Sequence, residues 1–293
     1  LRIRDDKKDP QFFIVANNVW ETITEPVTTD IIRGNDVVTE FKQDEDDELY
    51  YQQTSIKNSE PIRDLHNYIK SKLISRVITS KDMNKKMNIL DLSCGRGGDN
   101  MKYTKHDNIN FYMGLDISSN INEAAQRYYY QYGKKPHALF LQYDTSKIIK
   151  DKEGCLGEEE FCETMMNAIL GKEKSFHKKY KDIHTKYLGI AKDKFDLLSS
   201  QFSLHYYFKN EESLRGFCSN LSYLCADNGY FIGTCYDGMK VFKTFEKENK
   251  ENLYMNDSNG NLIYDIQKKY SIKDFKYSKS DTSSMLGQQI DVY

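Results

Sequence analysis

The sequence predicts an α/β fold in which a mostly parallel sheet carries helices on both of its faces. Three observations lead to this prediction: short apolar runs alternate with amphipathic stretches, the first run ends in a glycine-rich turn, and acidic residues end the first three runs. Strands that alternate with helices at this spacing form βαβ units, which place neighbouring strands parallel. The chain has 293 residues, enough for one large domain or for one domain with sizeable insertions.

The expected strands of this sheet are the apolar runs at residues 88–92, 111–117, 138–144, 194–202 and 230–236. Three helices are expected between them. The first begins at Asp99, and the other two cover residues 120–133 and 213–225. Gly133 closes the second of these helices, because glycine accepts the backbone conformation that ends a helix. Gly229 precedes the fifth strand.

A further helix is expected before the first strand, in "IRDLHNYIKSKLISRVI" at residues 62–78. Its apolar residues recur three or four positions apart, which predicts one apolar face. The residues of that face are Ile62, Leu65, Ile69, Leu73 and Val77. Asn67 and Lys70 fall on a different face.

Two parts of the chain interrupt this alternation. Residues 1–60 are irregular and carry an acidic run, so we expect an N-terminal extension followed by the main domain at 61–293. An insertion of about 50 residues, at 145–193, separates the third and fourth strands and contains a predicted helix in "GEEEFCETMMNAIL" and a basic stretch. The tail predicts two strands about an Asn-Gly turn and a last strand at 286–293.

Composition limits the classes of protein. The net charge of −2 does not indicate nucleic-acid binding, so an anionic substrate would need a local basic patch. The six cysteines show no zinc spacing, and as scattered free thiols they fit a reducing compartment. No apolar run is long enough for a membrane span and no signal peptide opens the chain. Because the first residue is Leu1, we expect a piece of a longer polypeptide.

The strongest local pattern is "NILDLSCGRGGD" at residues 88–99, where an apolar strand runs into a glycine-rich turn. Such glycines allow the backbone to approach a ligand closely. The order of acid, small residue and two glycines, at Asp91, Ser93, Gly95 and Gly97, favours S-adenosylmethionine (SAM) over a dinucleotide. A dinucleotide site and a purely structural turn remain the alternatives.

Acidic residues also end the next two strands. Asp116 closes the second strand, about 20 residues after the turn, where folds of this kind bind ribose hydroxyls. Its alternative role is the N-cap of a helix, for which Ser118 and Ser119 are better suited. Asp144 closes the third strand, where an acid can reach the adenine amino group.

The fourth strand ends in "SQFSLHYYF" at residues 200–208 and lacks the Asn/Asp-Pro-Pro-Tyr motif of amino-group methylases. This stretch, "LDLSCGRGGD" and "IRDLHNYIKSKLI" resemble motifs of the messenger RNA cap (guanine-N7) methyltransferases, over about residues 50–240. The resemblance implies a Rossmann-like class I SAM-dependent methyltransferase fold. The opening "NNVWETITEPVTTDII", the insertion and the composition are more similar to the methyltransferase domain of capping enzymes from large cytoplasmic DNA viruses.

The resemblance implies a set of site residues. Those expected at SAM are Asn67, Lys70, Asp91, Gly95, Asp99, Asp116, Asp144, Gln201 and Ser203. Those expected at the cap are Arg96 and Arg127, which match phosphate-binding positions, and His205 and Tyr206, which match guanine-binding positions. Ser93 departs from a frequent glycine of the family, and the family's cap-binding glutamate falls beyond the last motif present here.

Guanine N7 has a free lone pair, so the implied reaction needs neither a general base nor a metal, and proximity and orientation would supply the catalysis. A tyrosine face suits the flat ring, which becomes cationic on methylation. We expect Tyr206 to face the ligand and Tyr207 and Phe208 to pack in the core. The alternatives are a SAM methyltransferase for another substrate and a catalytically inactive RNA-binding regulatory subunit.

The resemblance also implies the setting of the protein. The expected partners are the capped 5′ end of RNA, with upstream triphosphatase and guanylyltransferase domains or a stimulatory subunit, and no membrane. The expected localisation is cytoplasmic for a viral enzyme, in a viral factory or virion, and nuclear for a cellular one.

Overall fold

The computed structural model describes residues 60–80, 85–132, 136–172, 185–271 and 286–293. The chain divides into two compact units, residues 1–51 and 52–293, and the description concerns the second. The acidic run and the rest of the expected N-terminal extension lie outside the described residues, so the boundary expected near residue 60 stays a prediction. Most of the predicted basic stretch of the insertion also lies outside them.

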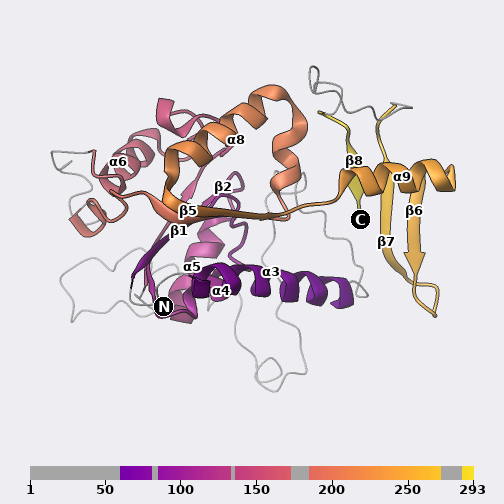
Figure 1. Ribbon diagram of the computed structural model, residues 1–293, viewed down its shortest axis with the longest axis horizontal. Helices are drawn as coiled ribbons and strands as arrows, with labels where there is room; N and C mark the ends of the chain where they lie inside the picture. The colour runs from indigo at the N-terminus through magenta and orange to yellow at the C-terminus, as the bar shows by residue number, and fades with distance from the viewer. Residues whose placement is uncertain (1–59, 81–84, 133–135, 173–184, 272–285) are drawn as a thin grey trace, which may run out of the picture. The chain divides into compact units, whose positions relative to one another are not determined.

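A five-stranded sheet forms the centre of the second unit (Figure 1). Its strands are β1 (Met87–Asp91), β2 (Ile109–Asp116), β3 (His137–Gln142), β4 (Phe195–Gln201) and β5 (Cys225–Thr234). They lie in the order β3-β2-β1-β4-β5, and every neighbouring pair is parallel. The predicted parallel sheet is therefore confirmed. The strand order reverses at β1, and in such sheets ligands bind in the crevice at the carboxyl ends of the strands.

Helices cover both faces of the sheet, as the sequence predicts (Figure 1). The helices are α3 (Glu60–Ser80), α4 (Asn100–Thr104), α5 (Ile121–Tyr132), α6 (Glu159–Ile169) and α8 (Glu211–Leu224). On one face, α3, α4 and α5 bury Ile74, Tyr103 and Tyr128 against the sheet. On the other, α6 and α8 bury Met165 and Phe217. Within the described residues, a large apolar cluster thus lies on each face of the sheet, and Cys94, Ile121 and Ala124 form a small third cluster.

The apolar face predicted for α3 is wrong in the first half of the helix. Leu65 and Ile69 are 56% and 43% exposed, whereas Ile74 and Ile78 are fully buried. Lys70 lies four residues before Ile74 and therefore shares its inward stripe. The ammonium group of Lys70 finds a carboxylate there, at 2.8 Å from Asp99. The inward side of α3 thus includes an ion pair with a residue far along the chain, which the local apolar pattern does not indicate.

Strand β5 begins earlier than predicted. It starts at Cys225, and its pairing with β4 jumps from Phe195–Cys225 to Leu197–Tyr230. The extra residues form an irregularity in which Asn228 has a φ of +60°. Gly229 therefore lies within the strand rather than before it. The third strand is shorter than predicted, because β3 ends at Gln142.

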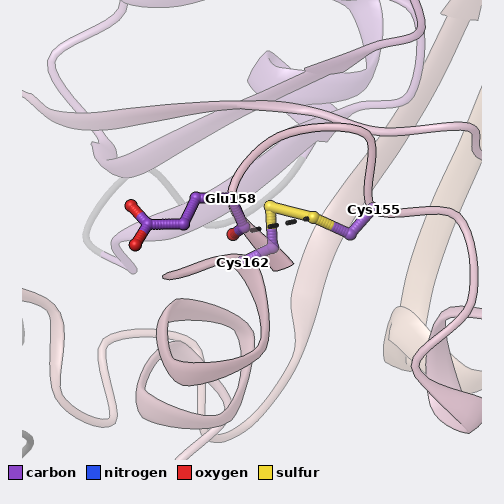
Figure 2. The surroundings of a disulfide bond; sticks show 3 residues. All are labelled: Cys155, Glu158 and Cys162. Carbon is purple, nitrogen blue, oxygen red and sulfur yellow. Dashed lines mark hydrogen bonds between the residues drawn. A yellow bond between two sulfur atoms is a disulfide. The ribbon is translucent and has the colours of Figure 1, made fainter. Parts of the chain in front are cut away.

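The insertion folds back on the end of β3. It contains the short 3-10 helix η3 (Ile149–Asp151) and α6, the predicted helix. Cys155 and Cys162 form a disulfide, with Cα atoms 6.3 Å apart, and the Cys155 sulfur lies against the Glu158 carbonyl (Figure 2). The expectation of six free thiols is therefore wrong for this pair. The loop before α6 brings the two sulfurs together, which cysteine spacing alone does not indicate.

The last part of the chain forms a separate antiparallel sheet after helix α9 (Gly238–Glu248). Its strands are β6 (Asn252–Asn256), β7 (Leu262–Lys268) and β8 (Ile290–Val292), in the order β6-β7-β8. The predicted turn is confirmed, with Gly260 at a φ of +85° between β6 and β7. The predicted last strand is confirmed for residues 290–292. In the described ranges, no helix has the length and apolar character that a membrane crossing requires.

Candidate active site

The glycine turn after β1 adopts a conformation that requires glycine. Gly95 and Gly97 have φ values of +51° and +74°, in the left-handed region. The N–H of Cys94 donates to the carbonyl of Leu115 at 2.9 Å, and the N–H of Gly95 donates to Oδ2 of Asp116 at 2.7 Å. These bonds fix the turn against the end of β2, so the two predicted cofactor segments form one unit.

Asp116 closes β2 with both carboxylate oxygens directed at backbone donors. Oδ2 accepts from Gly95, and Oδ1 accepts from the N–H of Ser118 at 2.9 Å. The side chain is 8% exposed, and burial raises its pKa although the backbone hydrogen bonds oppose this. Each oxygen keeps a further lone pair for a ligand hydroxyl. The N-cap alternative for Asp116 is wrong, because α5 begins only at Ile121.

Asp91 lies beneath the turn rather than on its surface. It is 1% exposed, and it accepts hydrogen bonds from the N–H of Ser93 and the hydroxyl of Tyr112. Burial and the nearby carboxylates of Asp99 and Asp116 raise the pKa of Asp91 to about 7. Its position supports the turn from within and contributes to the electrostatic field of the site.

A cluster of charged side chains joins α3 to the start of α4. Asp99 accepts from Lys70 at 2.8 Å and from Lys102 at 2.5 Å, and Lys102 also donates to Oδ1 of Asn67 at 3.2 Å. The lysine and aspartate side chains are only 11–15% exposed. The structure thus brings Asn67, Lys70 and Asp99 together as expected. Sequence reasoning missed Lys102, although its position three residues after Asp99 on one helix could have indicated it.

The end of β4 is tied to the glycine turn by hydroxyl groups. Ser203 Oγ hydrogen-bonds Ser93 Oγ across the crevice and Ser200 Oγ at 2.8 Å. Ser93, the departure from the family pattern, therefore has a structural role here. Because β1 and β4 are neighbours in the sheet, the bond between Ser93 and Ser203 joins the two loops that border the crevice.

Gln201 is buried, and both ends of its amide bond to other side chains. Its Nε2 donates to Ser199 Oγ at 2.9 Å, and its Oε1 accepts from Thr234 Oγ1 at 3.1 Å. Ser199 also accepts from the Tyr103 hydroxyl at 2.7 Å. Gln201 therefore sits in a network that holds the end of β4 against β5 and α4.

Phe202, which sequence reasoning did not assign, has a strained backbone at the end of β4. Its φ is +55°, and its N–H donates to the carbonyl and the hydroxyl of Thr234. Its ring lies 4.2 Å from that of His66, and the Lys70 ammonium is 5.8 Å from its centroid. A positive φ at an aromatic residue is uncommon and often marks a functional site. Phe202 thus links the β4 end to α3.

The stretch Leu204–Lys209 forms the 3-10 helix η5. Some of its aromatic rings are buried in the core and others are exposed. Tyr207 is 5% exposed, stacks on Phe217 at 4.0 Å and hydrogen-bonds the Thr145 hydroxyl at 2.6 Å, so its predicted core role is confirmed. Phe208 is 44% exposed, so its predicted core role is wrong. Tyr206 is 56% exposed, which agrees with its predicted place outside the core.

Three aromatic rings lie together after the ends of β4 and β5, those of His205, Tyr206 and Tyr236. The His205 ring lies 4.3 Å from Tyr206 and 5.6 Å from Tyr236. Burial lowers the pKa of His205, so the imidazole stays neutral near pH 7. Its Nδ1 is buried, and no described residue hydrogen-bonds it. Tyr236 follows β5 by two residues, and only the tertiary contact with His205 identifies it.

One of the two predicted phosphate-binding arginines pairs with a carboxylate of α5, and the other lies on α5 itself. Arg96 Nε is 3.6 Å from Glu123 of α5. Arg127 is exposed and lies four residues after Glu123 on the same helix, so it occupies the same face. Glu123 thus relates the two arginines, since it contacts Arg96 and lies one helical turn from Arg127.

Asp144 lies two residues beyond the end of β3, whose last residue, Gln142, pairs with Asp116. Its Oδ1 accepts from the N–H and the hydroxyl of Ser146 at 2.9 and 2.6 Å. In the described part of the chain, Oδ2 makes no hydrogen bond, so this oxygen can accept from a ligand. Across the described residues, no group of three or more His, Cys, Asp and Glu side chains could hold a metal ion.

The parallel sheet with its reversal at β1, the glycine turn and the acids after three successive strands define a Rossmann-like class I SAM-dependent methyltransferase fold. The chain belongs to the mRNA (guanine-N(7))-methyltransferase domain family, whose model matches residues 33–292. The match extends at both ends beyond the residues 50–240 that carry the motif resemblance.

Curated relatives agree with this family. The chain is 30% identical, over 95% of its length, to the "Probable mRNA-capping enzyme" of Acanthamoeba polyphaga mimivirus, of which it spans 23%. It is 29% identical, over 75% and 77% of its length, to proteins named mRNA cap guanine-N(7) methyltransferase from Eremothecium gossypii and Saccharomyces cerevisiae. It spans 44% and 43% of these two, so it covers less than half of each relative.

Solved structures are more distant. A protein from Pyrococcus horikoshii OT3 matches with a TM-score of 0.41 and 14% identity, over 77% of this chain and 79% of that one. The magnesium protoporphyrin IX methyltransferase of Synechocystis PCC 6803 with bound SAM matches with a TM-score of 0.40 and 13% identity, over 72% and 80%. At these scores the likeness adds nothing to the argument from the family.

Proposed function

We propose that this domain transfers a methyl group from SAM to guanine N7 of the mRNA cap. The observation that carries the proposal is that two groups of side chains lie at one edge of the sheet. One is a carboxylate cluster suited to SAM, and the other is a group of aromatic rings suited to a flat base. The carboxylate cluster consists of Asp91, Asp99, Asp116 and Asp144. Family membership supports the same activity. The two halves of the site meet at the β4 end, where Ser203 is bonded to Ser93 of the glycine turn.

The cofactor half of the proposal assigns a polar side chain to each of the three parts of SAM: the ribose, the adenine and the methionine moiety. Asp116 accepts from the ribose hydroxyls through its remaining lone pairs, and Asp144 Oδ2 accepts from the adenine amino group. Lys70 binds the carboxylate of the methionine moiety, with Asp99 and Asn67 beside it. The open backbone of Gly95 leaves room for the ligand, because a side chain there would project from a strained turn.

The cap half of the proposal uses the rings and the arginines. Tyr206 stacks on the guanine, and a base on an aromatic ring gains about 1–3 kcal/mol. His205, neutral by burial, hydrogen-bonds a base edge or a phosphate through its unpartnered Nδ1 or its other ring nitrogen. Tyr236 provides a further ring behind His205. Arg96 and Arg127 bind the phosphates.

The proposed mechanism is an in-line displacement without a general base. SAM supplies a methyl group that is already activated by its positively charged sulfur. The chain holds guanine N7 in line with that group, and orientation of this kind can contribute about 7–11 kcal/mol. Asp91 and Asp116 are held by backbone hydrogen bonds from Ser93, Gly95 and Ser118, so they keep their positions as the positive charge moves from sulfur to guanine.

The direct test is incubation of the protein with radiolabelled SAM and GpppA, followed by nuclease digestion and product mapping. The proposal expects label in 7-methylguanosine. Label in another position would assign a different methyl acceptor. SAM binding by calorimetry without any transfer would support the alternative of an inactive RNA-binding subunit.

We further propose that the domain works within a larger capping assembly. The support is that the mimivirus relative is named a capping enzyme and is about four times as long as the matched region. Triphosphatase and guanylyltransferase domains, or a stimulatory subunit, are the expected partners. A viral origin would place the reaction in the cytoplasm, and a cellular one in the nucleus.

A further inference from the structure

A cavity lies within the insertion between β3 and β4, apart from the proposed methyl-transfer site. It has a volume of about 200 Å³ and is lined by the end of β3, η3, α6 and one residue of α8. None of the residues proposed for SAM or the cap lines it. Sites for drug-sized ligands measure about 300–1,000 Å³. This cavity therefore suits one small group rather than a whole dinucleotide.

The rim of the cavity carries positive charge. Its lining includes one carboxylate, Glu163, and three lysines, Lys150, Lys152 and Lys172. Lys152 pairs with Glu163 at 2.9 Å, and the Lys172 ammonium donates a hydrogen bond to the hydroxyl of Tyr223 and lies 4.5 Å from the centroid of its ring. Lys150 forms no ion pair within the described residues. Two of the three ammonium groups thus remain without a carboxylate, which favours an anionic ligand.

The inner wall offers hydrogen-bond donors that the protein does not use. Tyr143 is only 3% exposed, and no described residue hydrogen-bonds its hydroxyl, although the residue lines the cavity. Burial, with the carboxylates of Glu163 and Glu153, raises the pKa of Tyr143 to about 12, so the hydroxyl keeps its proton. The Asn167 side chain also lines the cavity without a hydrogen bond to any described residue. Asn167 is half-buried, and both groups line the cavity, so they can hydrogen-bond a ligand that enters it.

The floor of the cavity is apolar and its wall is fixed. Ile149 and Met166, both buried, contribute the floor. Cys155 forms part of the wall, and its disulfide to Cys162 joins the loop to α6 (Figure 2). The same loop is paired with the end of β3 through Tyr143 and Cys155. The cavity is thus formed before any ligand enters.

We propose that this cavity binds a phosphate group together with the sugar that carries it, from an RNA chain or from a free mononucleotide. The ammonium groups of Lys150 and Lys172 neutralise the phosphate. The Tyr143 hydroxyl and the Asn167 amide hydrogen-bond phosphate or sugar oxygens, and the apolar floor contacts the sugar carbons. The site is independent of the methyl-transfer site and does not rest on the proposed reaction.

The test compares the wild-type chain with Lys150→Gln/Lys172→Gln, with Tyr143→Phe, and with Lys105→Gln as a control at an exposed lysine beyond the end of α4. One arm measures anisotropy of a labelled uncapped RNA of about 16 nucleotides, within the site size of single-strand binders. The other measures calorimetric binding of AMP. Each variant's melting temperature confirms that it folds.

For RNA, the double variant should bind roughly 10-fold more weakly. The slope of log K against log salt should fall by about 1.4, because each cationic contact to a single strand contributes about 0.7. Tyr143→Phe should lose about threefold to tenfold, the equivalent of one hydrogen bond. Loss in the RNA arm assigns an RNA phosphate, and loss in the AMP arm assigns a free nucleotide. Double-variant affinities equal to those of Lys105→Gln in both arms would overturn the proposal.

The outcome is separable from that of the proposed function. The variants of this cavity should methylate GpppA with unchanged kcat/KM, since none of its lining residues is proposed to bind SAM or the cap. A wild-type chain that fails to methylate GpppA would overturn the proposed function and leave the binding result with uncapped RNA unaffected.

Discussion

The backbone N–H of Gly95 donates a hydrogen bond of 2.7 Å to Oδ2 of Asp116. This contact joins two segments 21 residues apart and makes the shape of the glycine turn depend on the acid that ends β2. The same carboxylate is the proposed ribose ligand. Cofactor binding and turn geometry are therefore coupled through one side chain.

Asp116→Ala should reduce SAM affinity by at least about 100-fold, because it removes two charge-assisted hydrogen bonds worth roughly 1.5–3 kcal/mol each. The SAM affinity of Asp116→Asn should lie between those of wild type and Asp116→Ala, since the single carbonyl oxygen of asparagine can keep only one of the two backbone contacts. Calorimetry of SAM binding measures both, with Asp107→Asn as an exposed control. Unchanged affinity in Asp116→Ala would remove this residue from the cofactor site.

Arg96→Ala and Arg127→Ala should each weaken binding of GpppA and leave SAM binding nearly intact. The loss should shrink at high salt, where phosphate contacts are screened. Glu123→Gln should strengthen GpppA binding, because it removes the carboxylate 3.6 Å from Arg96. Fluorescence titration at low and high salt measures these effects, with Arg215→Ala on α8 as the control. Normal GpppA binding by both arginine variants at low salt would contradict the phosphate role.

Much of the fold could be predicted from the sequence, because strands, helices and the glycine turn follow from patterns within about ten residues. The glycines at 95 and 97 and the acid at Asp116 are examples, since each can be located from its own local pattern, although the bond between Gly95 and Asp116 appears only in the fold. The face of α3 could not be predicted, because the inward side of the helix includes Lys70, whose partner Asp99 lies 29 residues away, while Leu65 is exposed.

The parts of the site that sequence reasoning missed depend on tertiary contacts. Tyr236 belongs with His205 only because β4 and β5 are neighbours. The strained φ of Phe202 depends on Thr234, which lies 32 residues further along the chain. Cys155 and Cys162 match no spacing rule, and their pairing depends on how the loop folds onto α6.

The raised pKa of Asp91 predicts a pH dependence of stability. A carboxyl with a folded pKa of about 7, against 3.8 normally, binds its proton more tightly in the folded state. Its contribution to stability is therefore full below about pH 4 and is lost as the pH rises to about 7. Asp91→Asn removes this titration, and its amide can still bond to Ser93 and Tyr112.

Urea unfolding of wild type and Asp91→Asn at several pH values measures the effect. The free energy of unfolding of the variant, relative to wild type, should increase between pH 5 and pH 7 and level off above it. A difference that stays constant across that window would show that Asp91 titrates normally.

Tyr236→Ala should raise the KM for GpppA by roughly 10-fold, because it removes the ring 5.6 Å from His205 and frees the imidazole to turn. SAM affinity should not change, since Tyr236 is not among the residues proposed to bind SAM. Steady-state kinetics with GpppA and calorimetry with SAM separate the two. Kinetics equal to wild type would leave Tyr236 without a part in cap binding.

Tyr206→Ala should abolish most methylation, and Tyr206→Phe should retain much of it. Alanine removes the ring that holds the guanine in line with the methyl group, whereas phenylalanine removes only the hydroxyl. Because Tyr206 is 56% exposed, its loss should leave the melting temperature nearly unchanged. Tyr207→Ala is the matched control, since its buried ring stacks on Phe217. That variant should lose about 3–5 kcal/mol of stability through the cavity that it creates.

Thermal melts and single-turnover transfer to GpppA, measured on the same samples, therefore separate a ligand ring from a core ring. Tyr206→Ala should melt like wild type and transfer little, and folded Tyr207→Ala should melt early. If Tyr206→Ala instead melted far below wild type and its folded fraction still methylated GpppA well, Tyr206 would be a packing residue. The guanine would then have to stack elsewhere, and Tyr236 and Phe202 would be the rings to test next, because both lie at the same end of the sheet.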